Sequence, residues 1–208
     1  MRIPVAREGW SFVLPAAGAA CILALLGWWP VAAVFAIAAV AFLGFFRDPE
    51  RTAPRTPGAL VAPADGRVMA IVAVDDRWVG PAVRMSIFLS PLDVHVNRAP
   101  MAGLVRAVDR ASGRFLAAYR PEASEENARC AVAIEGDAAR VVVRQIVGVL
   151  ARRIVCRARV GDKLEAGERF GLIRFGSRTD LIAPRGSDVR VTVGERVRGG
   201  ETIMAMLQ

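Results

Sequence analysis

The chain has 208 residues, 54% of them apolar, and a formal net charge of +8. Its single histidine, His95, excludes a multi-histidine metal centre, and a pyridoxal enzyme would have to use the single lysine, Lys163. The three cysteines, Cys21, Cys130 and Cys156, are too widely spaced for a disulfide framework or a paired-cysteine metal site. We therefore expect neither a metal nor pyridoxal phosphate.

The positive charge comes mainly from arginine. The arginines are scattered without interleaved aromatic residues, so we expect no nucleic-acid partner. An anionic membrane surface is the better partner, although a generally arginine-rich composition explains the charge equally well.

An uncharged stretch of 38 residues, 9–46, contains 31 apolar residues. Pro30 divides it into runs of 18 residues (12–29) and 16 residues (31–46), each slightly short of the ~20 that a spanning helix needs. We predict a membrane-associating helical hairpin within 1–46, with basic residues on both flanks that place both ends in the cytoplasm. The stretch is too long for a cleaved signal peptide, and a shallow hairpin that only embeds in the membrane is left open.

Three prolines within 47–58 predict a linker. The rest of the chain, 59–208, is expected to form one mainly β (α+β) domain, a sandwich or barrel-like fold. Val- and Ile-rich runs predict strands, and Glu-Gly-Asp at 135–137 predicts a hairpin turn between two of them. The runs are 68–74, 83–89, 129–134 and 140–147. The segment 114–119 is expected to be irregular, and 121–129 to be a loop or a short helix.

An internal repeat relates 160–173 to 193–206 with a period of 33 residues. Both copies read Val-Gly-acid-x-apolar-x-x-Gly-Glu-x-apolar, and their glycines suit turns of positive φ between strands. Hairpins of this kind resemble those of lipoyl and biotinyl carrier domains. Such a carrier needs an acceptor lysine at a tight hairpin tip, which neither copy has, so we interpret the repeat as shared β scaffold.

Three segments carry residues suited to chemistry, although each alone has an ordinary explanation. Asp65 lies in an Asp-Gly turn before a predicted strand. His95, in 89–100, is the side chain best suited to proton transfer near neutral pH, but a lone histidine is often structural. Gly176-Ser177 is a common turn dipeptide.

Taken together and in this order, these segments resemble one family, the short bacterial form of phosphatidylserine decarboxylase. The resemblance covers almost the whole chain. Its motifs are Phe-Arg-Asp-Pro at 46–49, Pro-Ala-Asp-Gly at 63–66, Phe-Leu-Ser-Pro-Leu-Asp-Val-His-Val-Asn-Arg at 88–98, and Phe-Gly-Ser at 175–177.

The resemblance implies a proenzyme that cuts itself between Gly176 and Ser177. The Ser177 hydroxyl would attack the Gly176 carbonyl to form an ester, and elimination and hydrolysis would leave a covalent pyruvoyl group derived from Ser177. A large chain, 1–176, and a small chain, 177–208, would stay together. The pyruvoyl group would form a Schiff base with the substrate amine and accept the electrons left by carbon dioxide.

Roles for further residues also follow from the resemblance. His95 matches the family position that assists decarboxylation, and Asp65 matches the acid implicated in self-cleavage. Longer members carry a second histidine where this chain has Arg98, and arginine cannot act as a base. Either His95 serves both steps, or Asp65 acts directly or through water while Arg98 stabilises the oxyanion. Asn97 and Arg98 are also candidate substrate-binding residues.

The resemblance further implies that the substrate is phosphatidylserine held in a bilayer. We expect association with the bacterial inner membrane, with the catalytic domain in the cytoplasm, while homo-oligomerisation is left open. Two alternatives are a membrane-anchored β-sandwich adaptor or carrier without catalysis, and a pyruvoyl decarboxylase of a soluble amino acid.

Overall fold

The computed structural model describes residues 4–149, 153–174 and 176–208. The chain divides into two compact units, Met1–Glu50 and Arg51–Gln208, which are described separately. The first unit contains the short 3-10 helix η1 (Arg7–Gly9) and the helices α1 (Trp10–Leu25) and α2 (Trp29–Phe45).

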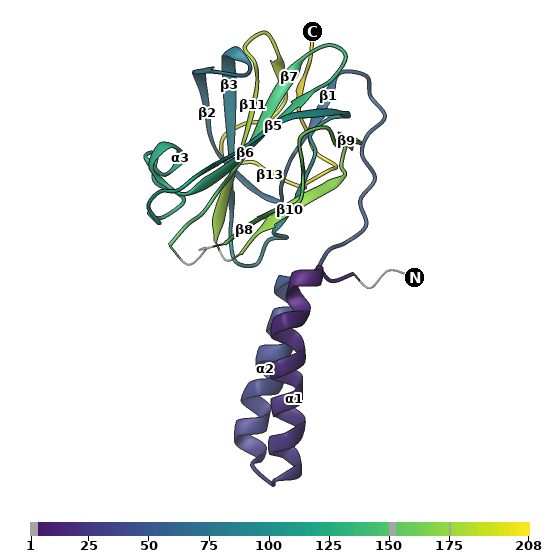
Figure 1. The fold of residues 1–208 in the computed structure, drawn as a ribbon, viewed down its shortest axis with the longest axis vertical. Coiled ribbons are helices and arrows are strands. Elements are labelled where there is room, and N and C mark those ends of the chain that lie inside the picture. Colours follow the sequence, from purple (N-terminus) through teal and green to yellow (C-terminus); the bar gives the residue numbers. More distant parts are fainter. Residues whose placement is uncertain (1–3, 150–152, 175) are drawn as a thin grey trace. The chain divides into compact units, whose positions relative to one another are not determined.

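The two helices form an antiparallel pair (Figure 1). Gly27 adopts a φ of +80° in the connecting turn, and Pro30 lies in the first turn of α2, where its missing N–H leaves no helical hydrogen bond unmade. Small buried side chains, such as Ala16 and Ala32, let the helices approach closely. The Phe12 ring lies 5.4 Å from the ring of Phe42, centroid to centroid.

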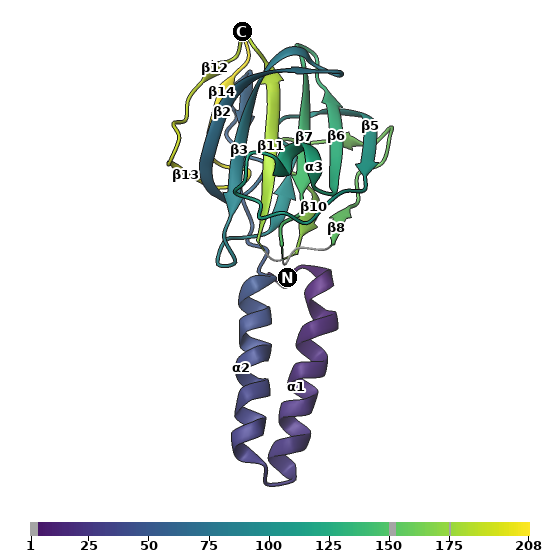
Figure 2. The same ribbon diagram turned by 90° about the vertical axis from the view of Figure 1, so that its left-hand side faces the viewer.

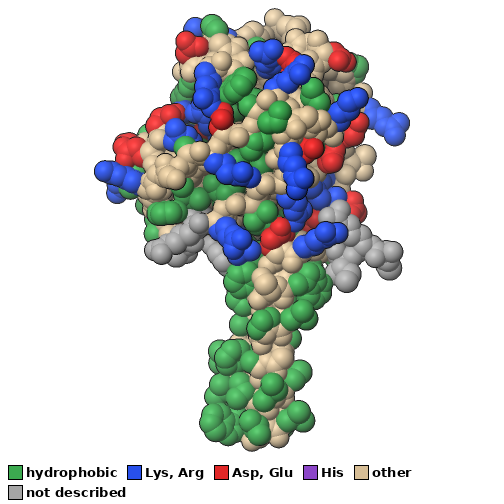
Figure 3. Space-filling model, viewed as in Figure 1, with side chains coloured by type: hydrophobic (Ala, Val, Ile, Leu, Met, Phe, Trp, Pro, Cys, Tyr) green, Lys and Arg blue, Asp and Glu red, His purple; other side chains and the backbone are tan. Residues whose placement is uncertain are grey.

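The outer surface of this helical pair is apolar (Figure 3). Large side chains such as Leu25, Trp29 and Ile37 are exposed around it, which is the pattern of a helix meant for a non-aqueous environment. The segment Arg7–Leu25 is long and apolar enough to cross a membrane, whereas α2 is slightly shorter. At ~1.5 Å per residue, α1 and α2 extend only about 24 and 26 Å.

The second unit is built almost entirely from strands. Its one helix over the described residues, α3 (Ala123–Glu126), is a single turn. The strands are β1 (Ala59–Val61), β2 (Gly66–Asp76), β3 (Gly80–Leu89), β4 (Val96–Arg98), β5 (Gly103–Ala111), β6 (Arg129–Glu135), β7 (Arg140–Ile146), β8 (Ile154–Cys156), β9 (Lys163–Leu164), β10 (Arg169–Ile173), β11 (Ser177–Pro184), β12 (Asp188–Val189), β13 (Arg196–Val197) and β14 (Ile203–Met206).

Within the described part of the chain, eight strands form one sheet in the order β13-β2-β3-β11-β7-β6-β5-β9, with every pair antiparallel. Figure 2 shows β2, β3, β11, β7 and β6 side by side in this order. Two three-stranded sheets, β1-β14-β12 and β4-β10-β8, complete the domain. The core lies between the large sheet and the small ones and includes Met85 and Leu181 from the former with Leu60, Phe170 and Met204 from the latter.

The internal repeat has a direct structural counterpart. Gly161 and Gly194 both have a φ of +95°, and Gly167 and Gly200 have φ values of +78° and +79°. The two strands of each copy do not pair with each other. In the first copy, β9 pairs with β5 of the large sheet, whereas β10 pairs with β4 and β8 of a small sheet. In the second copy, β13 pairs with β2 of the large sheet, whereas β14 pairs with β1 and β12 of the other small sheet. Each copy is therefore a turn that leads the chain from the large sheet into a small one.

The expected fold class is confirmed: a mainly β domain preceded by an apolar helical pair. The four predicted strands correspond to β2, β3, β6 and β7, with a turn at 135–137 between the last two. The segment 114–119 is irregular, and 121–129 contains α3. The predicted linker, 47–58, has no helix or extended strand and includes the boundary between the two compact units.

Candidate active site

Ser177 is the first residue of β11, the strand at the centre of the large sheet. It pairs with Leu89, the last residue of β3, while the next residue, Arg178, pairs with Ile146 at the end of β7. The Ser177 side chain is fully buried, and its Oγ has no hydrogen-bond partner among the residues that the structure describes. A buried hydroxyl without a partner is unusual in a folded protein and is a feature of reactive sites.

Gly176 precedes this serine and has a φ of +61°, in the left-handed region that favours glycine. Gly148, in the connection after β7, approaches it so closely that a Cβ at position 148 would lie 2.3 Å from the Gly176 carbonyl oxygen. The same Cβ would lie 3.3 Å from Ala118 Cβ. The connection after β7 therefore packs against the Gly176 carbonyl, and Ala118 of the connection after β5 lies beside Gly148.

His95, in the connection between β3 and β4, contacts the backbone N–H of Gly176, which lies on the other side of that residue from the Gly176–Ser177 peptide. Its Nε2 accepts a hydrogen bond from the Gly176 N–H at 3.4 Å, and its Nδ1 lies 2.8 Å from the carbonyl oxygen of Asp93. Because a carbonyl oxygen only accepts, Nδ1 carries the proton in the neutral ring, and these partners assign the unprotonated nitrogen to Nε2. The lone pair of a buried imidazole thus faces the backbone beside Ser177.

The Asp93 carboxylate holds this connection in place. Its Oδ2 accepts from the Ser90 N–H at 2.9 Å and from the Ser90 hydroxyl at 2.7 Å, which closes a tight turn before His95. Its Oδ1 pairs with Arg196 at 2.9 Å. The aspartate next to the histidine therefore orients the ring through its backbone carbonyl, while its side chain stabilises the turn.

Asn97 and Arg98 lie on β4, next to β10. Asn97 donates to Thr179 Oγ1 at 3.0 Å and accepts from Gln145 Nε2 at 2.8 Å, so its amide links β4 to β11 and β7 inside the core. The Arg98 guanidinium donates to the Gly167 carbonyl at 3.0 Å. Both side chains are buried, and their substrate-binding role stays a prediction.

Asp65 lies at the turn before β2. Its Oδ1 accepts from the Gly199 N–H at 2.8 Å, and its Oδ2 pairs with Arg51 at 3.0 Å. Its neighbour in this region is Arg98, whose Cδ would lie 2.8 Å from a Cβ placed on Gly200. The structure therefore brings His95, Gly176 and Ser177 together, and gathers Asp65 and Arg98 at the turn of the second repeat.

Sequence reasoning missed a buried polar cluster on the opposite face of β11. Arg178 Nε donates to Asp180 Oδ1 at 2.7 Å, and Arg178 Nη2 donates to Ser86 Oγ at 2.6 Å. The Ser124 hydroxyl of α3 donates to the other Asp180 oxygen at 3.1 Å. The sequence did contain a signal for this cluster. Arg178 and Asp180 are two residues apart, and the two-residue period of a strand places both side chains on one face.

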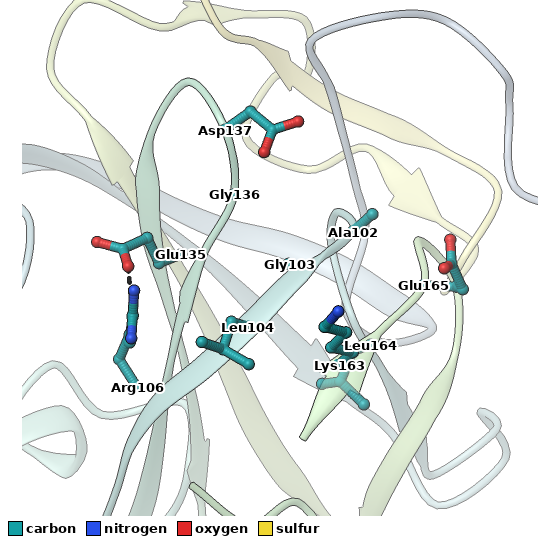
Figure 4. A pocket seen from close by; sticks show the side chains of 10 residues that line it. All are labelled: Ala102, Gly103, Leu104, Arg106, Glu135, Gly136, Asp137, Lys163, Leu164 and Glu165. Atoms are coloured by element: carbon teal, nitrogen blue, oxygen red, sulfur yellow. Dashed lines mark hydrogen bonds and ion pairs between the residues drawn. The ribbon is translucent and has the colours of Figure 1, made fainter. Parts of the chain in front are cut away.

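The only lysine is remote from this peptide. Lys163 is exposed and lines a hollow at the end of the sheet formed by the start of β5, the β6–β7 turn and β9 (Figure 4). Glu135 lies in the same hollow, where Arg140 and then Arg106 hold the pKa of its carboxyl below the usual range. By register, this end is opposite the one at which β11 begins.

A buried serine, a glycine with a left-handed φ before it and a histidine bound to the glycine N–H are the arrangement expected of a proenzyme that cuts its own backbone before a serine. The family model of phosphatidylserine decarboxylase matches residues 38–205. Three proteins named phosphatidylserine decarboxylase proenzyme are similar over nearly their whole length. They come from Symbiobacterium thermophilum (48% identity; 100% of this chain, 98% of that protein), Rhodopirellula baltica (44%; 99% and 89%) and Burkholderia mallei (42%; 98% and 95%).

The chain belongs to the phosphatidylserine decarboxylase family. Family membership confirms the resemblance drawn from the motifs. It does not favour the non-catalytic adaptor or the decarboxylase of a soluble amino acid.

Proposed function

We propose that this chain is a proenzyme that cuts itself between Gly176 and Ser177 and then decarboxylates phosphatidylserine to phosphatidylethanolamine. The observation that carries the proposal is the contact of His95 Nε2 with the Gly176 N–H, beside a buried Ser177 hydroxyl without a partner in the described chain. A base on the N–H side of Gly176 and a nucleophile in the next residue thus flank the Gly176 carbonyl.

In the first step, Ser177 Oγ attacks the Gly176 carbonyl carbon while His95 Nε2 takes the hydroxyl proton. The C–N bond breaks, the proton passes to the departing nitrogen, and an ester joins the two residues. Removal of the Ser177 Cα proton then expels the Gly176 carboxylate and leaves a dehydroalanine. Water then converts the dehydroalanine to a ketone and releases ammonia, so the atoms of the whole reaction balance.

The resulting pyruvoyl group fits the position of Ser177, since the side chain consumed has no hydrogen bond to lose there. When formed, the group supplies an electron sink for loss of carbon dioxide from an amine-bearing substrate. His95 remains beside it and is suited to return a proton from Nε2 to the substrate carbon. The same imidazole would thus serve both stages.

Strand pairing supports a stable assembly of the two pieces after the cut. The small chain, 177–208, would begin with β11, which pairs along its length with β3 and β7 of the large chain. It would also contribute β13 to β2 and β14 to β1. Breaking one peptide bond leaves these ladders in place.

The same family assignment supports a membrane location. The helical pair exposes apolar side chains, and Arg7 and Arg47 flank it. We propose that this unit embeds in the bacterial inner membrane, that the basic flanks face anionic lipid, and that the β domain acts in the cytoplasm.

The test compares His95→Gln with Asp65→Asn by electrophoresis and by assay on phosphatidylserine. Glutamine fills a similar volume but cannot take a proton, so we expect His95→Gln to stay uncut and inactive. Asp65→Asn keeps a side-chain acceptor for Gly199 but weakens the pair with Arg51, so we expect it to cut.

The two alternatives for the base give other patterns. If His95→Gln cuts but does not decarboxylate, while Asp65→Asn stays whole, Asp65 is the base for cleavage and His95 serves decarboxylation alone. If His95→Gln both cuts and decarboxylates at the parental rate, the role proposed for His95 is wrong.

A further inference from the structure

Four large apolar side chains are exposed in the connections around the Gly176–Ser177 peptide. They come from three separate segments, after β3, after β5 and after β7. We call them the apolar rim: Leu92 (83% exposed), Tyr119 (64%), Val149 (54%) and Phe115 (44%). Single exposed apolar residues are ordinary on a protein surface, whereas several gathered at the mouth of a site indicate an interaction surface.

Strand register places these connections at one end of the sheet. Ser177 pairs with Leu89 at the end of β3, and Ile146 at the end of β7 pairs with Arg129 at the start of β6. Arg129 in turn pairs with Ala111 at the end of β5. Each connection therefore leaves the sheet where β11 begins.

Contacts between the connections agree with this register. Ala118, one residue before Tyr119, packs against Gly148, one residue before Val149. Gly148 itself lies against the Gly176 carbonyl. The connections that carry Tyr119 and Val149 thus pack together next to the Gly176 carbonyl, and Leu92 lies in the turn that precedes His95.

The surrounding charge favours an anionic surface. In the segment 112–120, Arg120 is exposed, whereas Arg114 pairs with Glu126 of α3 at 3.1 Å. In the connection after β7, Arg153 is exposed just before β8, within the part of the chain that the structure describes. Apolar side chains bordered by cations match a bilayer that carries anionic headgroups above its acyl chains.

We propose that the apolar rim docks the β domain on an anionic lipid bilayer, with its apolar side chains inserted at the level of the headgroups. The inference rests on the proposed function and deepens it, because the lipid substrate would reach Ser177 without leaving the bilayer. Tyr119 suits this position, since tyrosine combines an apolar ring with a polar tip.

The test uses the full chain reconstituted in vesicles, with Leu92→Ser/Tyr119→Ser as the variant. Val160→Ser is the matched control, because Val160 is 66% exposed and lies beside the start of β5, at the other end of that strand. Two substrates are compared: long-chain phosphatidylserine within the bilayer, and dihexanoyl phosphatidylserine supplied as monomers from water to phosphatidylcholine vesicles.

We expect the double variant to lose about tenfold or more in kcat/KM on the bilayer substrate, through lost apolar insertion. Its kcat/KM on the monomeric substrate should stay within about twofold of the parent, and Val160→Ser should match the parent on both. Equal losses on the two substrates, or no loss on either, would overturn the proposal.

A second measurement does not depend on cleavage or activity. Full-length Leu92→Trp and Val160→Trp are placed in anionic vesicles whose acyl chains carry bromine, and the fluorescence of the parent is subtracted. Quenching of the tryptophan at 92 and none at 160 supports docking, even if the chain stays uncut. An uncut chain would refute only the proposed function. Equal quenching at the two positions contradicts docking.

Discussion

Gly176 and Gly148 fix the backbone geometry around the peptide bond at which we propose self-cleavage. The left-handed φ of Gly176 turns its carbonyl toward the connection after β7, where only a residue without a Cβ fits. Ser177 then enters a buried strand with its hydroxyl unpaired among the described residues. These positions hold the carbonyl and the nucleophile in a fixed relation.

A methyl group at position 148 should disturb this relation. In Gly148→Ala, the new Cβ would lie 2.3 Å from the Gly176 oxygen, so the backbone must move. We expect self-cleavage to slow by about a hundredfold, as ångström-scale misplacement of reacting groups does in other enzymes. The rate is read from the appearance of the small chain on gels.

Gly186→Ala is the control for that substitution, because a Cβ there meets nothing within 4 Å and its φ is not in the left-handed region. It should cut at the parental rate. Parental cleavage in Gly148→Ala would show that the close approach at Gly176 is not required.

The cysteines also differ in reactivity. A hydrogen bond from the Cys130 thiol lowers the pKa of Cys156 to about 7, and the same contact with burial raises the pKa of Cys130. Since the thiolate is the nucleophile, alkylation of Cys156 by iodoacetamide should rise with pH through a midpoint near that value.

Peptide mass spectrometry follows this reaction. Replacing the donor, in Cys130→Ala, should move the midpoint for Cys156 upward, toward the ordinary cysteine value of about 8.5. An unchanged midpoint would mean that the Cys130 thiol does not stabilise the Cys156 thiolate.

At the scale of elements, β11 organises the domain. Its two faces differ: Thr179 contacts Asn97 in the core, whereas Arg178 and Asp180 form a fully buried ion pair on the other face. A buried pair tolerates removal of both charges better than removal of one, because a single charge left behind has no partner.

Asp180→Asn should therefore lower the free energy of unfolding by about 3–5 kcal/mol. Denaturant unfolding of the uncut Ser177→Ala background measures it without complication from two chains. Asp188→Asn, which disrupts the exposed pair with Arg190, should cost less than about 1 kcal/mol. Equal costs for the two substitutions would contradict a buried role for Asp180.

The sequence predicted strands well where the residues are apolar and β-branched, as in β3 and β7. It did not predict β11, because Ser-Arg-Thr-Asp at its start is typical of a turn, and only tertiary partners such as Ser86 and Ser124 make these side chains suitable for burial. It did not predict β5 for a different reason: Arg106 and Arg110 are exposed side chains that interrupt its apolar pattern.

The candidate site was predictable in part. The motifs identified Ser177, Gly176 and His95, which the structure brings together. The role of Gly148 and the positions of Asp65 and Arg98 around Gly199 and Gly200 depend on contacts between distant segments, which a single sequence does not reveal.

For the whole molecule, the proposed function assigns membrane anchoring to the apolar helical pair and the chemistry to the β domain. Cys21 lies on the exposed surface of α1, so it reports on the environment of the helices. If these helices embed in a bilayer, a water-soluble maleimide should label Cys21 slowly in native membranes and rapidly after solubilisation in sodium dodecyl sulfate.

Cys156, which is partly exposed in the β domain, is the internal reference and should be labelled in both conditions. Equal labelling of Cys21 before and after solubilisation would place α1 outside the membrane.

Self-cleavage at Gly176–Ser177 is tested most directly by the intact mass of the purified full-length protein. We expect two species from the 22.3 kDa chain, the smaller of about 3.4 kDa in proportion to residues 177–208. The smaller species should lack an N-terminal serine and react with a carbonyl reagent such as a hydrazide. A single 22.3 kDa chain without a reactive carbonyl would show that the protein does not cut itself at this bond.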